Sequence, residues 1–310
     1  MRAVTLNEPD SAPALRGDLP EPTPAENEVL VRVRASSVNP VDNSIAAGML
    51  AQMGIEYEYP VTLGRDYAGV VEQAGAGVSG YRPGDQVFGF VLHANPTARD
   101  GSWVELITLT EELSIAPVPD GLDLAIAGAA PLAGITALTL VDALALSKGD
   151  VLLVAGATGG VGSLAVQLAA RAGAHVIAPA LSEDEAFLRG LGVGDVLPRD
   201  GDVAELVRER HPDGVDALID LVNYAPGTYD AALKPGVRVA SSTGAAGEGP
   251  GHANVMAAPT GENLERLGAL LADGTLRIHL QATYELAQAT EALAALPAEH
   301  TQGKLAIRVG

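Results

Sequence analysis

The chain contains no cysteine, and this absence removes several kinds of chemistry at once. Disulfide bonds, thiolate nucleophiles and every cysteine-based zinc site are excluded. Lysine is scarce too, and Asp and Glu outnumber Lys and Arg by 39 to 19. The net charge of −20 argues against nucleic acid as a partner, because phosphate binding requires clustered positive charge.

Long apolar runs are also missing, so no segment is predicted to span a membrane. The N-terminal stretch Met1–Thr5 is typical of a strand rather than of a signal peptide. We therefore expect a cytoplasmic protein. Hydrophobic residues make up 47% of the 310 positions, which is enough for large cores and favours two domains.

The strongest local signal is a strand, a glycine-rich turn, a helix and a second strand within about 30 residues, which is a βαβ unit. The first strand begins at Val151, the helix continues to about Arg171 and ends at Gly173, and the second strand covers residues 175–178. The turn carries Ala157, Thr158, Gly159, Gly160, Val161 and Gly162. Its pattern is a variant of the dinucleotide-binding fingerprint, with alanine in the first position.

The two later glycines of this turn have separate roles in such a site. Gly159 lets the backbone approach a pyrophosphate, and Gly162 lets the helix pack closely on the strand. The helix N-terminus adds free N–H groups and a partial positive charge. A glycine turn without a ligand is the alternative, but the flanking strand and helix supply the context that the motif requires.

The rest of the chain divides into three parts. Residues 1–115 contain short strands between Gly and Pro turns, which is typical of a β-barrel. From residue 116 to 259 helices alternate with strands, which predicts a doubly wound parallel sheet. Residues 260–310 return to a helix, a strand, a helix and a strand. The less regular elements are expected as a strand at 101–108, a helix at 228–233 and a strand at 276–280.

Several separated stretches match one known family in order and spacing. They are residues 38–42 (VNPVD), 64–71 (GRDYAGVV), 134–137 (GITA), the glycine turn and 303–306 (GKLA). Together they resemble the zinc-independent quinone oxidoreductase (zeta-crystallin-like) branch of the medium-chain dehydrogenase/reductase superfamily.

The resemblance implies an α/β protein with a GroES-like β-barrel catalytic domain beside a Rossmann doubly wound parallel sheet. The catalytic domain would cover residues 1–115, completed by 260–310, and the Rossmann domain 116–259, with the active site in the cleft. It also implies a homodimer that uses NADPH to reduce quinones or α,β-unsaturated carbonyls. The dimer is expected to form through residues 254–258, which would extend the Rossmann sheet.

Two positions separate the chain from its zinc-dependent relatives. Asn39 stands where those relatives have a cysteine ligand, and Arg65 stands where they have a histidine. No metal site is predicted, because the six histidines show no paired spacing; they are His93, His175, His211, His252, His279 and His300. Without a Lewis acid, a conjugated enone or quinone is the easier substrate, since charge formed on hydride delivery delocalises to an oxygen.

Asn39 and Arg65 are therefore the candidate catalytic residues. The Asn39 amide would donate to the substrate oxygen, and Arg65 would stabilise the enolate. Each has a structural alternative. Asn39 precedes Pro40 and is a normal helix cap, and Arg65 has Asp42 and Asp66 as possible ion-pair partners.

The choice between NADPH and NADH depends on the end of the second Rossmann strand. An NAD site ends this strand with Asp or Glu, whereas here Ala180 occupies the position. Arg199 is placed by the resemblance to bind a 2′-phosphate, and Ser182 would add a hydroxyl. We expect NADPH, but NADH is not excluded, because acidic residues 183–185 crowd the same corner and Ser182 with Glu185 also reads as a capping box.

The remaining cofactor contacts are expected where strands end. Thr136 is placed near the nicotinamide carboxamide. The nicotinamide pocket is expected to be lined by Val222, Asn223, Ser242, Thr243 and Gly244.

Two other functions compete with this one. A short-chain dehydrogenase has a similar glycine turn, but it needs Tyr-x-x-x-Lys, and none of the seven tyrosines is followed by such a lysine. A non-catalytic NAD(P)H-binding redox sensor or structural protein stays open as the alternative.

Overall fold

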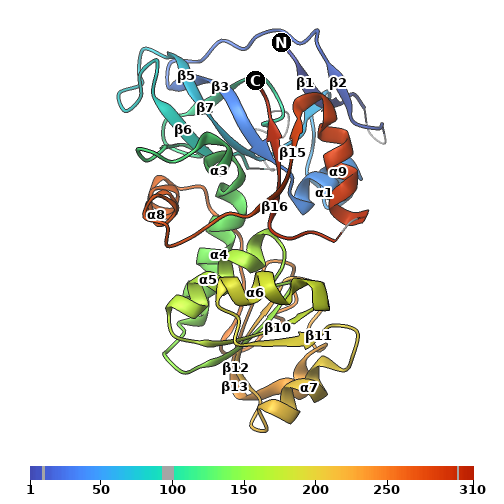
Figure 1. The fold of residues 1–310 in the computed structure, drawn as a ribbon. Coiled ribbons are helices and arrows are strands. Elements are labelled where there is room, and N and C mark those ends of the chain that lie inside the picture. The colour runs from blue at the N-terminus through green and yellow to red at the C-terminus, as the bar shows by residue number, and fades with distance from the viewer. Residues whose placement is uncertain (9–10, 93–100, 299) are drawn as a thin grey trace. The chain divides into compact units, whose positions relative to one another are not determined.

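The computed structural model describes residues 1–8, 11–92, 101–298 and 300–310 (Figure 1). His93, one of the six histidines, therefore lies outside the described residues. The chain forms two compact units: Met1–Leu132 with Ala258–Gly274 and Ile278–Gly310, and Ala133–Ala257 with Thr275–Arg277. The first boundary falls later than the expected one at residue 115, because helix α3 (Leu124–Ala129) packs on strands of the first unit.

The first unit is mainly antiparallel β structure. Its strands are β1 (Ala3–Leu6), β2 (Ala14–Arg16), β3 (Glu28–Ser37), β4 (Val61–Thr62), β5 (Asp66–Ala74), β6 (Gln86–Phe90), β7 (Leu106–Thr110), β8 (Ala116–Pro117), β15 (Leu280–Glu285) and β16 (Lys304–Arg308). Its helices besides α3 are α1 (Pro40–Ala46), α2 (Met49–Gln52), α8 (Gly261–Ala272) and α9 (Ala289–Ala298), with a 3₁₀ turn at Leu286–Gln288.

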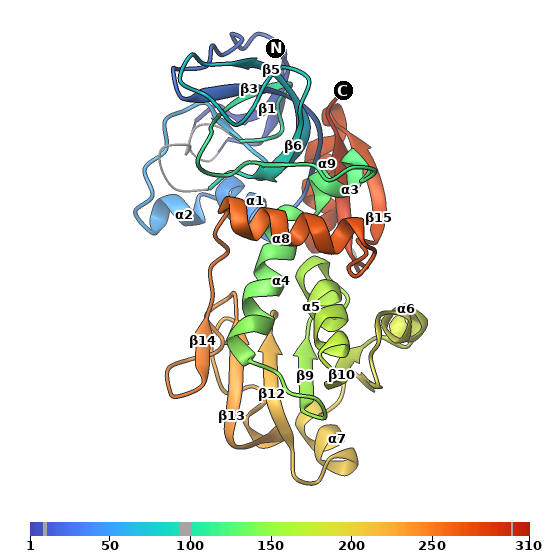
Figure 2. The same ribbon diagram turned by 90° about the vertical axis from the view of Figure 1, so that its left-hand side faces the viewer.

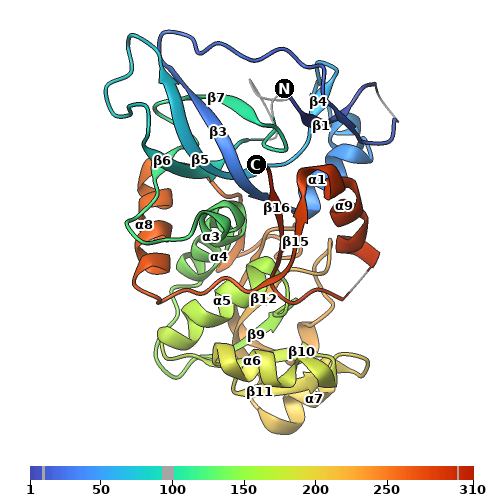
Figure 3. The same ribbon diagram turned by 45° about the horizontal axis from the view of Figure 1, so that its top comes forward.

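These strands form two sheets with a common core. One sheet has the order β2-β1-β4, and the other has the order β15-β16-β3-β5-β6-β8 with β7 also on β3 (Figure 3). Strand β16 pairs antiparallel with β3, with Ala306 opposite Ser37, so the C-terminal segment forms part of this unit. Val4 of β1, Val33 of β3 and Ile307 of β16 belong to the same buried cluster.

The single tryptophan lies at the centre of this packing. Trp103 is fully buried, and its indole N–H donates to the Ser37 carbonyl at 3.2 Å. The ring packs against Gly64, whose φ is +87° and whose Cβ, if it had one, would lie 2.2 Å from Trp103 Cδ1. Only glycine meets both requirements at position 64.

The second unit is a six-stranded parallel sheet with helices (Figure 2). Its elements are α4 (Pro131–Leu144), β9 (Val151–Ala155), α5 (Gly160–Arg171), β10 (His175–Ala180), α6 (Glu185–Leu191), β11 (Asp195–Pro198), α7 (Val203–Arg210), β12 (Val215–Asp220), β13 (Leu233–Ser241) and β14 (His252–Asn254), with 3₁₀ turns at Ser182–Asp184 and Asp230–Ala232. The strand order is β11-β10-β9-β12-β13-β14. The direction of winding therefore reverses between β9 and β12, which is where such sheets bind ligands.

Three local predictions were wrong. The helix expected at 228–233 is only the 3₁₀ turn Asp230–Ala232, because Leu233 already pairs in β13. The strand expected at 276–280 is β15 at Leu280–Glu285, since the apolar alternation continues past residue 280 and pairing with β16 sets its ends. The strand expected at 101–108 is β7 at Leu106–Thr110. No helix among the described residues has the length and apolar character needed to cross a bilayer.

Candidate functional site

The glycine turn that follows β9 is a tight reversal into α5. Gly156 adopts φ +85°, and the backbone N–H of Gly159 donates to its carbonyl at 3.3 Å. A Cβ at Gly162 would lie 2.0 Å from the Gly156 oxygen, so the close approach of turn and helix requires glycine there. Gly156 was not singled out from the sequence, although a glycine directly after an apolar strand was the signal for it.

Gly159 is different, because the described residues around it do not require glycine. Its φ of −72° suits any residue, and the nearest atom to a Cβ at this position is the Gly156 oxygen at 3.7 Å. The position caps the N-terminus of α5, whose first N–H groups have no helical partner. The space beside Gly159 is thus open to a ligand, as an approaching pyrophosphate needs.

The loops after β12 and β13 interlock beside this turn. The Asp220 carboxylate accepts from the backbone N–H groups of Val222 at 3.0 Å and Asn223 at 3.1 Å, and from the Asn223 amide at 2.8 Å. The Thr243 hydroxyl donates to the Asn223 carbonyl, and Thr243 lies in one loop with Ser242 and Gly244, whose φ is +94°. The last residues of β9 and β12 pair in the sheet, which places these loops at the same edge as the glycine turn.

Thr136 stands apart from these loops in the chain. It lies on α4 and is buried, in the same unit as the parallel sheet.

The corner after β10 carries no carboxylate at the position that would bind a ribose. Ala180 ends the strand and is buried. The Arg199 backbone N–H donates to the Ala180 carbonyl at 3.1 Å, so Arg199 directly adjoins this strand end. Its side chain is 49% exposed and lies 3.8 Å from the Asp200 carboxylate, which leaves the guanidinium accessible.

The acidic residues of this corner are arranged differently from the prediction. The expected capping box between Ser182 and Glu185 does not form. Instead the Asp184 carboxylate accepts from the Leu181 N–H at 3.2 Å and is fully buried, because the helical segment begins one residue earlier. Glu185 accepts from Arg189 at 2.8 Å. The carboxylates of Asp184 and Glu185 therefore accept hydrogen bonds within the protein, while Glu183 and Ser182 are exposed.

In the first unit, Asn39 lies in a buried polar network between β3, β5 and β16. Its amide nitrogen donates to Asp66 Oδ2 at 2.7 Å, and its amide oxygen accepts from Lys304 Nζ at 2.6 Å. Asp66 also accepts from the Ser37 hydroxyl at 2.6 Å and from the Leu132 N–H at 2.7 Å. The ammonium on one side and the carboxylate on the other fix the orientation of the amide.

Asn39 is also the N-cap residue of α1, but its side chain does not cap the helix. Its backbone N–H donates to Asp42 Oδ2 at 2.8 Å, which is the return half of a capping box. Asp42 is fully buried, and its other carboxylate oxygen has no hydrogen-bond partner among the described residues. Burial is the largest effect and raises the pKa of Asp42 to about 7, against the opposing influence of Arg65.

Arg65 is buried, with 1% of its surface exposed. It donates to the Leu92 carbonyl and the Thr62 carbonyl, each at 3.1 Å. Its charge lowers the pKa of the Asp42 carboxyl, so the two are electrostatically coupled. Lys304 and Asp66, which complete the surroundings of Asn39, were not recognised from the sequence as parts of a site, because residues 39, 66 and 304 are distant in the chain.

Known proteins place this architecture in a family. Residues 25–120 match the alcohol dehydrogenase GroES-like domain, and residues 191–307 match the zinc-binding dehydrogenase domain. A chloroplast envelope quinone oxidoreductase homolog from Arabidopsis thaliana is 30% identical over 93% of this chain and 92% of its own length. The chain belongs to the quinone oxidoreductase branch of the medium-chain dehydrogenase/reductase superfamily.

Two further relatives are consistent with this membership. A 2-methylene-furan-3-one reductase from Solanum lycopersicum is 30% identical over 94% of this chain and 74% of its own length. The solved structure of a quinone oxidoreductase from Coxiella burnetii superimposes with a TM-score of 0.85 at 27% identity, covering 100% of this chain and 99% of that one. The family confirms a GroES-like unit with a Rossmann-like parallel sheet, an oxidoreductase activity and a nicotinamide cofactor.

Proposed function

We propose that the chain is an NADPH-dependent, zinc-independent oxidoreductase that transfers a hydride to a quinone or an α,β-unsaturated carbonyl compound. The observation that carries the proposal is the open backbone at Gly159, at the N-terminus of α5 and beside the point where the sheet changes direction. When bound, the nicotinamide supplies the hydride.

The residues of the turn, from Ala157 to Gly162, would hold the pyrophosphate through backbone N–H groups. The interlocked loops with Val222, Asn223 and Thr243 would form the wall beside the nicotinamide, with Thr136 of α4 as a further contact. The hydrogen bond from Val222 to Asp220 comes from the backbone N–H and helps to hold this wall in place. It does not involve the Val222 side chain, and the residue is 49% exposed.

The preference for NADPH is supported by the corner after β10. A 2′-phosphate would meet the Arg199 guanidinium, which is only weakly engaged by Asp200, and the exposed Ser182. Ala180 offers no carboxylate to repel it. The burial of Asp184 and the pairing of Glu185 with Arg189 reduce the acidic repulsion at this corner.

Zinc does not fit the position that its ligands would occupy in zinc-dependent relatives. The chain has no cysteine, and Asn39 is already bonded to a buried ammonium, that of Lys304. Arg65 adds a second buried cation at the other expected ligand position. Two positive charges oppose a divalent cation, so no step of the reaction is assigned to a metal.

Substrate activation would then depend on hydrogen bonding. Hydride delivery to a conjugated carbonyl creates negative charge on oxygen, which an oriented amide stabilises. The Asn39 amide has two N–H groups, and among the described residues one bond from Nδ2, to Asp66, is seen. Arg65, whose guanidinium donates to the Leu92 and Thr62 carbonyls, would contribute through its positive charge. Two relatives, a quinone oxidoreductase homolog and a 2-methylene-furan-3-one reductase, have names that support this substrate class.

Assembly and location complete the proposal. Strand β14 (His252–Asn254) forms an edge of the parallel sheet, and we propose that residues 254–258 continue this edge across a homodimer. A cytoplasmic location is proposed with it. A solution mass corresponding to one chain of 31.5 kDa would contradict the dimer.

The test uses a matched pair of glycine substitutions. Gly159→Ala places a methyl group in open space and should fold normally but lose NADPH affinity by tenfold or more, whereas Gly162→Ala meets the Gly156 oxygen and should unfold more easily. Thermal unfolding and an NADPH titration measure the two effects. Unchanged NADPH affinity in the folded Gly159→Ala variant would refute the proposed cofactor site.

Catalysis is tested separately on protein treated with EDTA. Stopped-flow loss of NADPH absorbance is followed with a quinone and with a conjugated enone. Turnover of either supports zinc-independent reduction. Tight NADPH binding without turnover of both substrate classes would favour the non-catalytic binding protein instead.

A further inference from the structure

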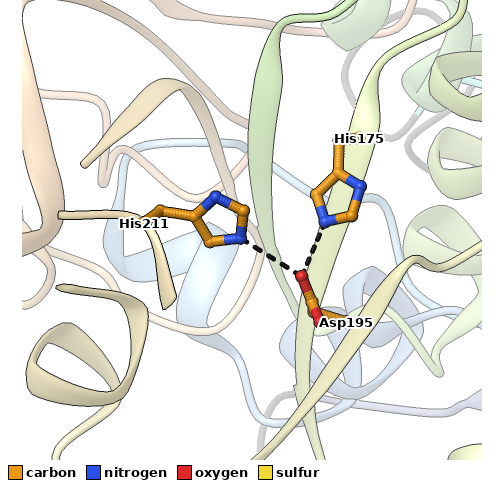
Figure 4. Close-up of side chains that lie close together, drawn as sticks. All are labelled: His175, Asp195 and His211. Carbon is orange, nitrogen blue, oxygen red and sulfur yellow. Dashed lines mark hydrogen bonds and ion pairs between the residues drawn. The ribbon is translucent and has the colours of Figure 1, made fainter. Parts of the chain in front are cut away.

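Three potential metal-ligating side chains converge at one edge of the parallel sheet (Figure 4). Asp195 Oδ2 accepts from His175 Nε2 at 2.6 Å and from His211 Nε2 at 3.1 Å. The three ligand atoms all lie within 4.8 Å of one another. The sequence shows no paired spacing between these histidines, so only the folded chain reveals the cluster.

The topology of the second unit explains why they meet. His175 is the first residue of β10 and Asp195 is the first residue of β11, and the two strands are parallel neighbours. Helix α7 returns the chain from the far edge of the sheet, and His211 directly follows its last residue, Arg210. All three therefore lie at the amino-terminal edge, opposite the edge that carries the glycine turn.

The local backbone is shaped around one of the rings. A Cβ at Gly194 would lie 2.5 Å from His175 Cε1, so the absence of a side chain there allows the imidazole to lie against the backbone. Arg210 donates to the other oxygen of Asp195, Oδ1, at 3.2 Å. This contact orients the carboxylate and leaves Oδ2 directed toward the two histidines.

We propose that His175, Asp195 and His211 bind a divalent transition metal of the class that prefers imidazole ligands, with zinc as its representative. Two imidazole nitrogens and one carboxylate oxygen are a typical three-ligand set, which leaves a further position for water. Ligand atoms about 2.0–2.2 Å from zinc stand roughly 3.3 Å apart in a tetrahedron. The ligand atoms lie within 4.8 Å of one another, so binding requires shifts of up to about 1.5 Å, which rotations of these partly exposed side chains can provide.

The exposure of these side chains and the negative charge of Asp195 also suit a bound cation. The side chains of His175, Asp195 and His211 are 42%, 25% and 20% exposed, so an ion can enter from solvent while the carboxylate stays partly shielded. The guanidinium of Arg210 reduces the affinity but leaves the ligand atoms themselves open. The ion would tie β10, β11 and the segment after α7 together and stabilise this unit by mass action.

This site is separate from the proposed reaction. It lies at the opposite edge of the sheet from Gly159 and uses none of the residues assigned to the cofactor. Its substitution should leave NADPH binding unchanged, so the two proposals can fail independently.

The experiment is a zinc titration of the full-length chain after EDTA treatment, read by competition with a chromogenic chelator and by the unfolding temperature. The wild type is expected to bind zinc with one-to-one stoichiometry and to unfold at a higher temperature with zinc. His175→Gln and His211→Gln should each weaken zinc binding by about tenfold or more and abolish the temperature shift. His279→Gln, at an exposed histidine outside the cluster, is the matched control and should behave as the wild type.

NADPH titration and circular dichroism establish that each variant is folded, and Asp195→Asn provides a third variant should one of the others fail this test. Absence of saturable zinc binding by the wild type would overturn the proposal. So would zinc binding that survives substitution of both histidines. If the wild type binds no zinc, the three side chains form a hydrogen-bonded group only.

Discussion

The buried carboxyl of Asp42 makes the stability of the first unit dependent on pH in a direction that can be measured. The pKa of this group rises from 3.8 to about 7 on folding, chiefly because it is buried, while Arg65 and Lys304 lower it and Asp66 raises it. One pKa unit corresponds to about 1.4 kcal/mol, so the whole shift is worth about 4 kcal/mol. That is a large share of the 5–15 kcal/mol typical of folded domains.

The sign follows from proton binding. Between about pH 4 and pH 7 the folded chain retains a proton at Asp42 that the unfolded chain has lost. Stability therefore falls as pH rises through this window and is level above it. Asp42→Asn cannot titrate but keeps an oxygen that can accept from the Asn39 N–H. The variant should thus gain on the wild type as pH increases, by about 3 kcal/mol between pH 5 and pH 8.

Urea unfolding followed by the fluorescence of Trp103 measures this difference. The chain has one tryptophan, and it is buried in the same unit as Asp42, so the signal reports on that unit. Asp120→Asn removes an exposed carboxylate of the same unit and is the control, with no comparable gain. A difference between Asp42→Asn and wild type that does not change with pH would refute the reasoning. It would mean that Asp42 is ionised throughout, held by Arg65 as an ion pair.

Two further substitutions test the proposed reaction. Asn39→Ala should lower kcat by about 10²–10³ and weaken NADPH binding much less, as expected for a donor that acts in the transition state. Its control is Ser37→Ala, which removes another donor to Asp66. Equal losses in kcat and in NADPH binding would make Asn39 a positioning residue. Arg199→Gln should raise the Kd for NADPH by about 10–100-fold while that for NADH changes little. Arg171→Gln, at the far end of α5, controls for loss of an exposed arginine, and tighter binding of NADH than of NADPH by the wild type would contradict the assignment of Ala180 and Arg199.

Elements with a strong local signal were predictable from the sequence. The strand before the glycine turn and helix α5 occur where expected, and Gly173 follows the helix with φ +86°. Helix α7 (Val203–Arg210) also has clear local signals, because Asp202 caps it and its apolar positions repeat with helical spacing. These features depend on neighbouring residues, which a sequence displays directly.

Features that depend on tertiary contacts were not predictable in the same way. The role of Asp184 was missed because the helical segment begins one residue before the Ser182 pattern indicated, which buries the Asp184 carboxylate. The proximity of His175 to His211 depends on the strand order of the sheet and on where α7 ends. Spacing along the chain carries no information of this kind, since it identifies pairs on one element only.

The buried charged residues around Asn39 are better explained as groups that orient its amide than as groups that stabilise the fold. Lys304 and Asp66 are almost fully buried, and their charged atoms are 3.4 Å apart. Buried ion pairs are commonly no more stable than apolar residues of the same volume, because removing both charges from water costs as much as their attraction returns. Stability alone therefore gives no reason for an ammonium at this place. Its bond to the Asn39 oxygen and the Asp66 bond to the nitrogen hold the amide in one rotamer and polarise its N–H groups toward donation. An amide held in this way would meet a developing oxyanion without reorganisation, which is the property that a reductase working without a metal needs.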